Sequence, residues 1–356
     1  MAASKAESFD ITIIGSGPGG YVAAVRAAQL GLRTAVVEMA PAPGGTCLHW
    51  GCIPTKAMLQ AAEVLETTRH AAGFGVRVPD GSTIDLDAMH GYKKKVVDGN
   101  AKGVEYLFKK NKVTYLAGRG KLAGPGKVEV TPEGGDPYVV ETTHTIVATG
   151  STIRGLPGVE FDGEKIIHSD HALYLDRLPK SLIVLGAGAV GVEFASIYRS
   201  FGCEVGVVEL LPNLVPLEDA DLGKELARNF KKRKIDVHVG TRVESVKATK
   251  TGVAIQAEKN GKPLELKAEV LLIAIGRKPL IDDIGLAGTR VKIDDRGFIE
   301  VDEMMRTGEP GVYAIGDVLA TQALAHVASH EGIVAVEHAG GGTPHAIDYA
   351  KVPSCT

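Results

Sequence analysis

The sequence predicts an α/β fold, and three observations indicate it. Glycine is frequent, with 44 residues among 356, whereas aromatic residues make up only 5% of the chain and apolar residues 44%. Short apolar stretches end at glycine-rich turns and lead into helical stretches, which is the pattern of parallel strands joined by crossover helices. One complete unit of strand, glycine turn, helix and strand occurs twice. A chain of this length has room for two or three domains with substantial cores.

The first of these units begins near the N-terminus. Its parts are a predicted buried strand, a glycine turn, a predicted helix and a second strand: residues 9–14, 15–20, 21–30 and 34–37. Gly15 permits the tight turn, Gly17 lets backbone approach a pyrophosphate, and Gly20 lets the helix pack closely on the strand. The helix N-terminus attracts phosphate groups. Glu38, 23 residues beyond Gly15, would accept hydrogen bonds from a ribose.

The second unit repeats this arrangement in the middle of the chain. Its strand, glycine turn and second strand are predicted at residues 182–185, 186–191 and 203–208, and an amphipathic helix after the turn runs through Phe201. Gly186, Gly188 and Gly191 occupy the turn, and Glu209 again lies 23 residues beyond the first glycine. A single glycine-rich turn of this kind is weak evidence, because such turns occur in many α/β proteins for packing alone. Two complete units with matching acidic residues predict two Rossmann-like dinucleotide-binding domains.

The residues after the second acidic position indicate which nicotinamide cofactor is used. A carboxylate at Glu209 pairs with free ribose hydroxyls and repels a 2′-phosphate. Leu210 and Leu211 follow it, and no arginine stands nearby. The sequence therefore favours NAD over NADP.

Two cysteines five positions apart, Cys47 and Cys52, follow the first unit. In an ideal α-helix such a pair has Cα atoms roughly 8.6 Å apart, beyond the limit of about 7 Å for a disulfide. A bridge therefore needs a distorted backbone, which Gly51 and Pro54 can supply. Two other readings stay open at this point: a pair of free buried cysteines, and a zinc site that adds His49, although structural zinc requires four protein ligands.

The charge and the cysteine content limit the classes of protein to which the chain can belong. The net charge of −3 gives no electrostatic footprint for nucleic acid. Four cysteines in the whole chain, of which Cys203 and Cys355 have no evident partner, favour a reducing compartment over a secreted disulfide scaffold. Residues 1–8 lack the apolar core of a signal peptide, and no run approaches the ~18 apolar residues that span a bilayer. We therefore expect a soluble cytoplasmic protein with neither nucleic acid nor membrane as a partner.

Three further strands are predicted outside the two units, at residues 145–148, 271–275 and 312–316. The first two end in a glycine turn, and the third ends at Asp317, ahead of a helical stretch from Leu324. An acid at the carboxyl end of a strand lies where open α/β sheets bind ligands, but Asp317 also fits a simple helix cap.

With both units and the cysteine pair in place, the chain resembles the pyridine nucleotide–disulfide oxidoreductases, and within them the branch that acts on lipoamide. The resemblance runs from about Phe9 to Ser354, and residues 44–56 are its most specific part. Stretches 103–111 and 274–279 are also similar to that branch.

The resemblance implies a particular domain organisation. An FAD-binding domain would comprise residues 1–152 and 278–350, with an NAD-binding domain, residues 153–277, inserted in it. Residues 351–356 would begin a C-terminal dimerisation domain that this sequence otherwise lacks. The residues implied in FAD binding are Gly15, Gly17, Gly20, Glu38, Thr46, Lys56, Gly120, Thr149, Gly150, Asp317, Ala325 and His326. Those implied in NAD binding are Gly186, Gly188, Gly191, Glu209 and Gly276.

The resemblance also implies a reaction without a metal. Dihydrolipoamide on a lipoyl carrier protein attacks the Cys47–Cys52 disulfide at Cys47, Cys52 becomes the thiolate beside the flavin, and electrons leave to NAD. Pro54 after Cys52 predicts a helix start, which favours that thiolate. Lys56 and Glu193 would form an ion pair beside the flavin, although Glu193 also fits a solvated helix position. The implied partners are a 2-oxo acid dehydrogenase or glycine cleavage complex, and a second copy in a homodimer.

Other functions stay open beside this one. A sibling reductase would act on glutathione or mercuric ion, and a non-catalytic flavin-binding component would hold cofactor without turnover. In the family, a histidine and its glutamate partner from the C-terminal domain provide acid–base catalysis for the dithiol. None of the eleven histidines here stands out as a replacement. These 356 residues are therefore expected to be poor in dithiol turnover.

Overall fold

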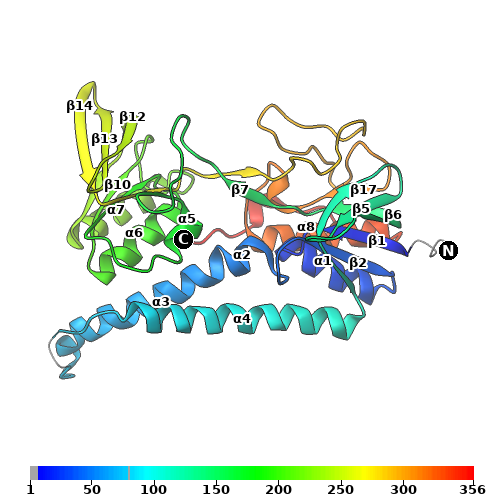
Figure 1. Ribbon diagram of the computed structural model, residues 1–356, viewed down its shortest axis with the longest axis horizontal. Coiled ribbons are helices and arrows are strands. Elements are labelled where there is room, and N and C mark those ends of the chain that lie inside the picture. The colour runs from blue at the N-terminus through cyan, green and yellow to red at the C-terminus, as the bar shows by residue number, and fades with distance from the viewer. Residues whose placement is uncertain (1–6, 79–80) are drawn as a thin grey trace. The chain divides into compact units, whose positions relative to one another are not determined.

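The structure of the chain is a computed structural model that describes residues 7–78 and 81–356 (Figure 1). The chain divides into two compact units, each made of several segments. Unit 1 contains Met1–His49, Asp98–Thr152 and Lys278–Cys355, and unit 2 contains Trp50–Val97 and Ile153–Arg277 together with Thr356. Beyond residue 49, the chain passes between units within helix α4 (Leu86–Asn111) and within strands β7 (Ser151–Ile153) and β16 (Arg277–Pro279).

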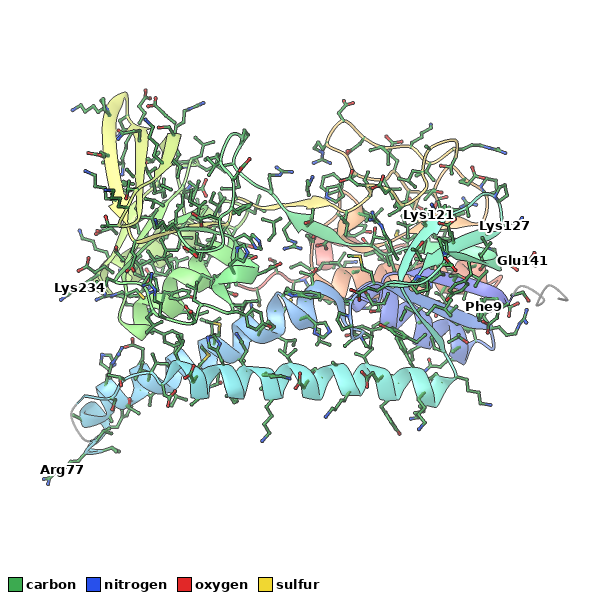
Figure 2. The ribbon with its side chains drawn as sticks, in the orientation of Figure 1. Phe9, Arg77, Lys121, Lys127, Glu141 and Lys234 are labelled. Atoms are coloured by element: carbon green, nitrogen blue, oxygen red, sulfur yellow. The ribbon has the colours of Figure 1, made fainter. Side chains whose placement is uncertain are left out.

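Unit 1 is built on a seven-stranded sheet in the order β3-β2-β1-β6-β5-β4, with β17 also paired to β6. The strands are β1 (Ser8–Ile14), β2 (Thr34–Glu38), β3 (Thr114–Ala117), β4 (Arg119–Leu122), β5 (Lys127–Thr131), β6 (Tyr138–Val147) and β17 (Val312–Ala314). The β3, β2, β1, β6 and β17 pairings are parallel, whereas β6, β5 and β4 pair antiparallel. Lys121 and Lys127 mark this antiparallel part in Figure 2. Every residue of β2 is buried, as expected for a strand covered on both faces.

Two helices of unit 1 pack closely against each other. They are α1 (Pro18–Gln29) and α8 (Ala325–Ala339), and the remaining short helices of the unit are α2 (Gly45–His49), η2 (Gly316–Val318) and η3 (Tyr349–Lys351). A Cβ at Gly332 of α8 would lie 2.8 Å from the Gly19 carbonyl oxygen, so the close crossing requires glycine there. Arg26 and Glu337 form an ion pair of 2.6 Å between the two helices.

Unit 2 contains a five-stranded parallel sheet in the order β11-β10-β9-β15-β8 and a three-stranded antiparallel sheet, β12-β13-β14. These strands are β8 (Ile166–Ile167), β9 (Ser181–Leu185), β10 (Glu204–Val208), β11 (Ile235–His238), β12 (Thr241–Ala248), β13 (Val253–Lys259), β14 (Lys262–Ala268) and β15 (Val270–Ile273). The helices are α5 (Ser169–Ala172), α6 (Ala189–Phe201) and α7 (Ala220–Lys232). Strand alternation divides the core: Leu182 and Val184 pack with α6, while Ile183 and Leu185 pack with β13.

Residues 50–97 belong to unit 2, whereas the sequence interpretation included them in the first domain. They form α3 (Cys52–His70), η1 (Ala71–Phe74) and the first half of α4. Met58 and Leu65 lie in the same buried core as Phe194, and the Arg69 guanidinium donates to the Ser200 carbonyl at 2.5 Å. The apolar face of α3 is visible in the sequence, but the surface that it covers is not.

Most predicted elements occur with small shifts of their ends, but the strand predicted at residues 145–148 is only the end of β6, which begins at Tyr138. Helix α1 begins at Pro18, three residues earlier than predicted, and β10 begins at Glu204, one residue later. Helix α3 begins at Cys52, which confirms the predicted helix start. Among residues 7–78 and 81–356, no helix is both long enough and apolar enough to cross a membrane.

Candidate functional site

The first glycine turn connects β1 to α1 in unit 1. Gly15 adopts φ +106° and donates its N–H to the Val37 carbonyl at 2.8 Å. A Cβ at Gly20 would clash with the Gly15 carbonyl oxygen, so the helix reaches the strand only because glycine stands there. Helix α1 has no side-chain cap at Gly17, which leaves its first N–H groups available to an anion.

Glu38 lies at the end of β2 beside this turn, and its side chain is 8% exposed. Its Oε2 accepts the Ser16 N–H at 2.9 Å and the Ser16 hydroxyl at 2.6 Å, while Oε1 accepts the Ala40 N–H at 2.8 Å. These bonds fix the carboxylate next to the turn. The bare helix start and the fixed acid fit the phosphate and ribose groups of a dinucleotide.

The segment that carries the first cysteine covers this turn. The Gly44 N–H lies 3.1 Å from the Ser16 carbonyl and 3.2 Å from the Ser16 hydroxyl. Gly45 adopts φ +62°, and a Cβ there would lie only 2.5 Å from the Gly17 Cα. Helix α2 begins at Gly45 and contains Cys47, so the cysteine is fixed within two residues of the contact with the glycine turn.

Cys47 and Cys52 are disulfide-bonded, and because Cys203 and Cys355 are free, they are each other's partner. The bond excludes two free thiols and a thiolate zinc site in this state of the protein. Helix α2 ends at His49, and Gly51 adopts φ −141° and ψ −112°, outside the helical region. Gly51 therefore supplies the required distortion, whereas Pro54 simply occupies the first turn of α3.

The other two cysteines are unlike this pair. Cys203 is 1% exposed, and burial raises the pKa of its thiol to about 12. A thiol with such a pKa is not a nucleophile near neutral pH. Cys355 is an exposed free thiol near the end of the chain. The redox chemistry of the chain therefore centres on Cys47 and Cys52.

Lys56 and Glu193 form the predicted ion pair within unit 2. The Lys56 ammonium donates to Oε1 at 2.7 Å and to Oε2 at 2.8 Å of Glu193. The Glu193 side chain is only 12% exposed, so its alternative interpretation as a solvated helix residue is wrong. Lys56 follows Cys52 by four residues on α3, which places the two side chains on one face of the helix.

The second glycine turn connects β9 to α6 in unit 2 and repeats the first in detail. Gly186 adopts φ +102° and donates its N–H to the Val208 carbonyl at 2.8 Å, and a Cβ at Gly191 would clash with the Gly186 carbonyl oxygen. Glu209 is 9% exposed and accepts the Ala187 N–H at 2.7 Å and the Leu211 N–H at 2.8 Å. A Cβ at Gly188 would meet no atom within 4 Å.

The other residues implied in cofactor binding are spread over several elements. Gly120 on β4 lies against β1 and β2, and a Cβ there would be 3.0 Å from Ile14 and Val37 side-chain atoms. The Thr149 hydroxyl donates to the Leu280 carbonyl at 2.6 Å, and the Gly150 carbonyl accepts the Leu280 N–H at 2.9 Å. The rest lie as follows: Thr46 in α2, Asp317 in η2, Ala325 and His326 at the start of α8, and Gly276 just after β15.

Three polar residues of unit 1 were missed by the sequence analysis. Ser16 bonds Glu38, Ser151 donates its hydroxyl to Asp317 Oδ2 at 2.5 Å, and Glu331 accepts the Gly316 N–H at 2.6 Å. Glu331 had a detectable signal, because it interrupts the apolar face of α8 between Val327 and Val334. Nothing in the local sequence marks Ser16 or Ser151.

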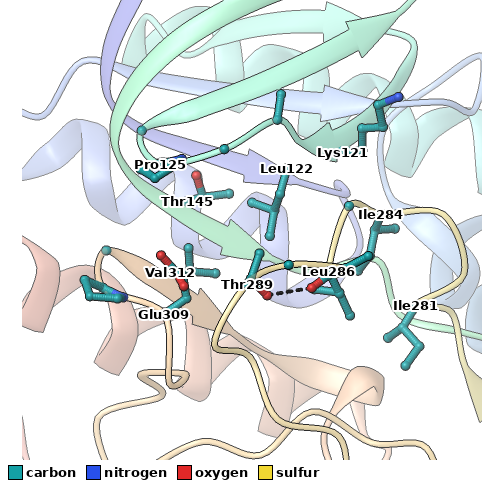
Figure 3. Close-up of a pocket in the computed structure, with 18 of the residues that line it drawn as sticks. Lys121, Leu122, Pro125, Thr145, Ile281, Ile284, Leu286, Thr289, Glu309 and Val312 are labelled. Atoms are coloured by element: carbon teal, nitrogen blue, oxygen red, sulfur yellow. Dashed lines mark hydrogen bonds between the residues drawn. The ribbon is translucent and has the colours of Figure 1, made fainter.

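Unit 1 also contains a cavity of about 770 Å³, shown in Figure 3. It lies between the turn joining β4 to β5 and two loops, residues 281–289 and 309–312. Two hydrogen bonds hold the loop of residues 281–289. The Leu122 N–H donates to the Ile284 carbonyl at 2.9 Å, and the Thr289 hydroxyl donates to the Leu286 carbonyl. None of the residues implied in catalysis or cofactor binding lines it, so the site described above lies elsewhere.

Two dinucleotide-type glycine turns together with a disulfide at a helix start define a nucleotide-dependent disulfide oxidoreductase. Comparison with known proteins agrees, since the family described as pyridine nucleotide-disulphide oxidoreductase matches residues 9–332. The chain belongs to this family. Dihydrolipoyl dehydrogenase of Bacillus subtilis is 44% identical over 98% of this chain and 75% of its own length. Mitochondrial dihydrolipoyl dehydrogenase of Pisum sativum is 42% identical over 99% of this chain and 70% of its own.

A solved structure agrees at the level of the fold. The crystal structure of LpdA from Mycobacterium tuberculosis superposes with a TM-score of 0.87 at 30% sequence identity, covering 96% of this chain and 74% of that one. The chain is thus a flavin disulfide oxidoreductase, and its cofactors are FAD and NAD.

Proposed function

We propose that this chain oxidises dihydrolipoamide and passes the electrons to NAD, as a dihydrolipoamide dehydrogenase does. The observation that carries the proposal is the Cys47–Cys52 disulfide, held against a glycine turn by Gly45 and placed at the start of α3. Relatives named dihydrolipoyl dehydrogenase, 42% and 44% identical over nearly the whole chain, support lipoamide as the substrate.

The proposed chemistry of the cysteines begins with a substrate thiolate. It attacks the Cys47 sulfur, a substrate–Cys47 disulfide forms, the Cys47–Cys52 bond breaks, and Cys52 leaves as a thiolate. The second substrate thiol, after losing its proton, attacks the substrate sulfur of that mixed disulfide and releases Cys47. Lipoamide departs with its own disulfide formed. Two electrons have then moved to the cysteine pair.

The location of Cys52 suits a leaving thiolate. It is the first residue of a 19-residue helix, and Gly51 before it offers no side-chain cap. The free N–H groups and partial positive charge at the helix start stabilise a thiolate there. Lys56, one turn further along, adds a positive charge whose position is fixed by Glu193.

Unit 1 is proposed to hold FAD. Gly15, Gly17, Gly20 and Glu38 would bind its ADP half, and the residues of this unit nearer the flavin would be Thr46, Gly120, Thr149, Gly150, Asp317, Ala325 and His326; the family resemblance adds Lys56, which lies in unit 2. The bare start of α1 and the carboxylate of Glu38 have the donor and acceptor groups that phosphate and ribose require. Bound FAD and NAD supply the two-electron and hydride chemistry that protein side chains lack.

Unit 2 is proposed to hold NAD through Gly186, Gly188, Gly191, Glu209 and Gly276. The open space at Gly188 lets a pyrophosphate approach the backbone. The buried carboxylate of Glu209 repels a 2′-phosphate, and Leu210 and Leu211 beside it, which are 55% and 46% exposed, offer that phosphate no positive charge. NAD is therefore preferred to NADP.

The biological setting is proposed from the same chemistry. The substrate would be the lipoyl group on a carrier protein of a 2-oxo acid dehydrogenase or glycine cleavage complex, and the protein would act as a homodimer. A cytoplasmic location is supported by the small number of cysteines.

A polypeptide made only of residues 1–356 is proposed to transfer electrons from NADH to artificial acceptors but to turn over dihydrolipoamide slowly. General acid–base help with the dithiol is worth typically 10²–10⁴-fold. His326 and His338, two histidines of the last region, are engaged by the Pro353 carbonyl at 2.9 Å and the Tyr313 hydroxyl at 2.9 Å. Full dithiol turnover by a preparation verified as 356 residues would contradict this proposal.

Thiol labelling tests the proposed function directly. Anaerobic treatment with one equivalent of dihydrolipoamide, followed by iodoacetamide and mass spectrometry, should place the new labels on Cys47 and Cys52. Cys47→Ser and Cys52→Ser should each abolish this uptake of two electrons. Cys203→Ser is the matched control and should behave as the wild type, because that thiol is buried and free.

A substrate panel then separates the alternatives. NADH-dependent reduction of lipoamide should exceed reduction of glutathione disulfide and of mercuric ion. Faster turnover of either of the other two would favour a sibling reductase. Binding of FAD without any labelling of the two cysteines by dihydrolipoamide would favour a non-catalytic flavin-binding component.

A further inference from the structure

One buried carboxylate of unit 1 has no part in the chemistry described above. Glu331 lies in α8, and its side chain is 0% exposed. Its Oε2 accepts the Gly316 N–H at 2.6 Å, and its Oε1 accepts the Thr321 hydroxyl at 2.8 Å and the Tyr349 hydroxyl at 2.9 Å. The segment before α8, through Gly316 and Thr321, and the segment after it, through Tyr349, therefore converge on one side chain.

The surroundings of this carboxylate make its burial costly in folding free energy. Within the described chain, the hydrogen bonds that it accepts come from one N–H and two O–H groups, and neither Lys nor Arg is among the donors. Burial raises the pKa of Glu331 above its usual range, although the hydrogen bonds from Gly316, Thr321 and Tyr349 act in the opposite direction. A buried acid with only neutral donors is destabilising unless its hydrogen bonds are well formed. Its place in an otherwise apolar helix face therefore depends on these three hydrogen bonds.

The hydrogen bond from Gly316 to Glu331 restricts the conformation of the chain next to Asp317. Gly316 adopts φ +73° immediately before it, and a Cβ at Gly316 would already approach the Ala328 Cβ at 3.2 Å. The Glu331 bond fixes the N–H of Gly316, the residue before Asp317, and the Ser151 hydroxyl donates to the Asp317 carboxylate at 2.5 Å. The orientation of Asp317 is thus set before any ligand arrives.

We propose that Glu331 is a positioning residue for FAD, which holds the Gly316–Asp317 turn in its binding conformation by accepting the Gly316 N–H. This inference rests on the proposed function, in which Asp317 binds FAD. Glu331 acts through Asp317 and needs no contact with the cofactor. What matters is an acceptor oxygen at this position, since the donor is a neutral amide.

The dissociation constant of FAD from the apoprotein tests the proposal. Glu331→Leu leaves the Gly316 N–H buried without an acceptor, so FAD should bind about ten- to hundredfold more weakly. Glu331→Gln keeps an amide oxygen for that N–H, and the Thr321 and Tyr349 hydroxyls can rotate to accept from its NH₂ group. Its affinity for FAD should stay within about threefold of the wild type.

Tyr349→Phe is the matched control. It removes one hydroxyl from the same carboxylate but leaves the bond to Gly316, so its FAD affinity should also stay within about threefold of the wild type. Binding of NADH by unit 2, followed by fluorescence, should be unchanged in all three variants. An NADH affinity that falls in step with FAD affinity would indicate general misfolding and overturn the assignment.

Hydrogen exchange of the wild-type apoprotein provides a measurement that needs no variant. The Gly316 amide should be protected before FAD is added, because its acceptor is already in place. Rapid exchange there would contradict the proposal, as would wild-type FAD affinity in Glu331→Leu or equal losses in the Leu and Gln variants. Failure of the wild-type protein to bind FAD would refute the proposed function instead.

Discussion

The two glycine turns are nearly identical in their backbone, but their surroundings differ. Gly15 and Gly186 adopt φ +106° and +102°, and each donates its N–H to the neighbouring strand at 2.8 Å. The first turn lies against the cysteine segment, since a Cβ at Gly45 would be only 2.5 Å from the Gly17 Cα, although a Cβ at Gly17 itself would meet only the Gly45 Cα, at 4.0 Å. At the second turn, a Cβ at Gly188 would meet nothing within 4 Å.

The acidic residues themselves do not extend this difference. Glu38 accepts the Ala40 N–H and is followed by Met39, which is 64% exposed, and Glu209 accepts the Leu211 N–H and is followed by Leu210, which is 55% exposed. Leu217, in the loop beyond the second turn, is 95% exposed. A covered turn suits a cofactor that stays bound through many reactions, and an open turn suits one that enters and leaves in each. We infer that the same fingerprint serves a resident FAD in unit 1 and an exchanging NAD in unit 2.

The largest expected effect comes from adding a methyl group where the helix of each glycine turn packs on its strand, in one unit at a time. Gly20→Ala places a Cβ against the Gly15 carbonyl, and Gly191→Ala does the same at Gly186, so the backbone must shift in each. Gly20→Ala should lower FAD affinity by at least about 100-fold and leave NADH binding intact, while Gly191→Ala should do the reverse. Flavin absorbance after purification and NADH titration measure the two. Loss of both cofactors in either variant would contradict independent sites.

A smaller and unequal effect should follow from substitutions at the cover itself. Gly45→Ala would press on Gly17 at 2.5 Å and requires a residue with φ +62°, so it should destabilise the apoprotein by about 1–3 kcal/mol and weaken FAD binding. At Gly188 a Cβ has free space and φ is an ordinary −70°. Gly188→Ala should therefore leave the stability of the apoprotein within about 0.5 kcal/mol of the wild type and weaken only the binding of NADH. Thermal unfolding of both apoproteins makes the comparison. Equal destabilisation would show that the first turn is not covered.

The open turn should accept a change of specificity. Leu211→Arg, at a side chain that is 46% exposed, places a cation where a 2′-phosphate would lie. The ratio of NADPH to NADH affinity should rise about tenfold, because one cation partly offsets the carboxylate of Glu209. FAD content is the control and should not change. An unchanged ratio would argue that the ribose lies elsewhere.

The smallest effect concerns the one polar side chain that distinguishes the turns. Ser16→Ala removes the 2.6 Å bond from its hydroxyl to Glu38 and makes the first turn like the second, at a cost of about 1–2 kcal/mol in the free energy of unfolding. Ala187→Ser, the reciprocal change, should alter it by less than about 0.5 kcal/mol. Urea denaturation of the apoproteins measures both. A larger cost for Ala187→Ser would reverse the assigned importance of the hydroxyl.

Much of the fold was predictable because its signals are local. The apolar strands, the glycines that permit close packing, the acids 23 residues further on and the helix start at Cys52 are all contained in short stretches of sequence. The backbone break between the cysteines was predictable as well, although Gly51 alone supplies it. These features depend on neighbouring residues and on steric rules that hold in any protein.

What could not be predicted depends on distant contacts. Residues 50–97 pack with unit 2 because Met58 and Leu65 meet Phe194, a partner 129 or more positions away. Ser151 bonds Asp317, which is 166 positions away, and Glu331 bonds Gly316, which is 15 positions away. The assignment of FAD and NAD to individual residues remains a prediction from the resemblance, since it depends on contacts with the cofactors.

The central claim is that a covered turn retains its cofactor and an open turn exchanges it. Stopped-flow displacement of bound NADH by excess NAD, compared with the loss of FAD from the same protein during gel filtration, measures both release rates. We predict that FAD stays near one equivalent per chain while NADH leaves within seconds, a difference of at least about 100-fold in rate. Release of FAD as fast as NADH would contradict the account.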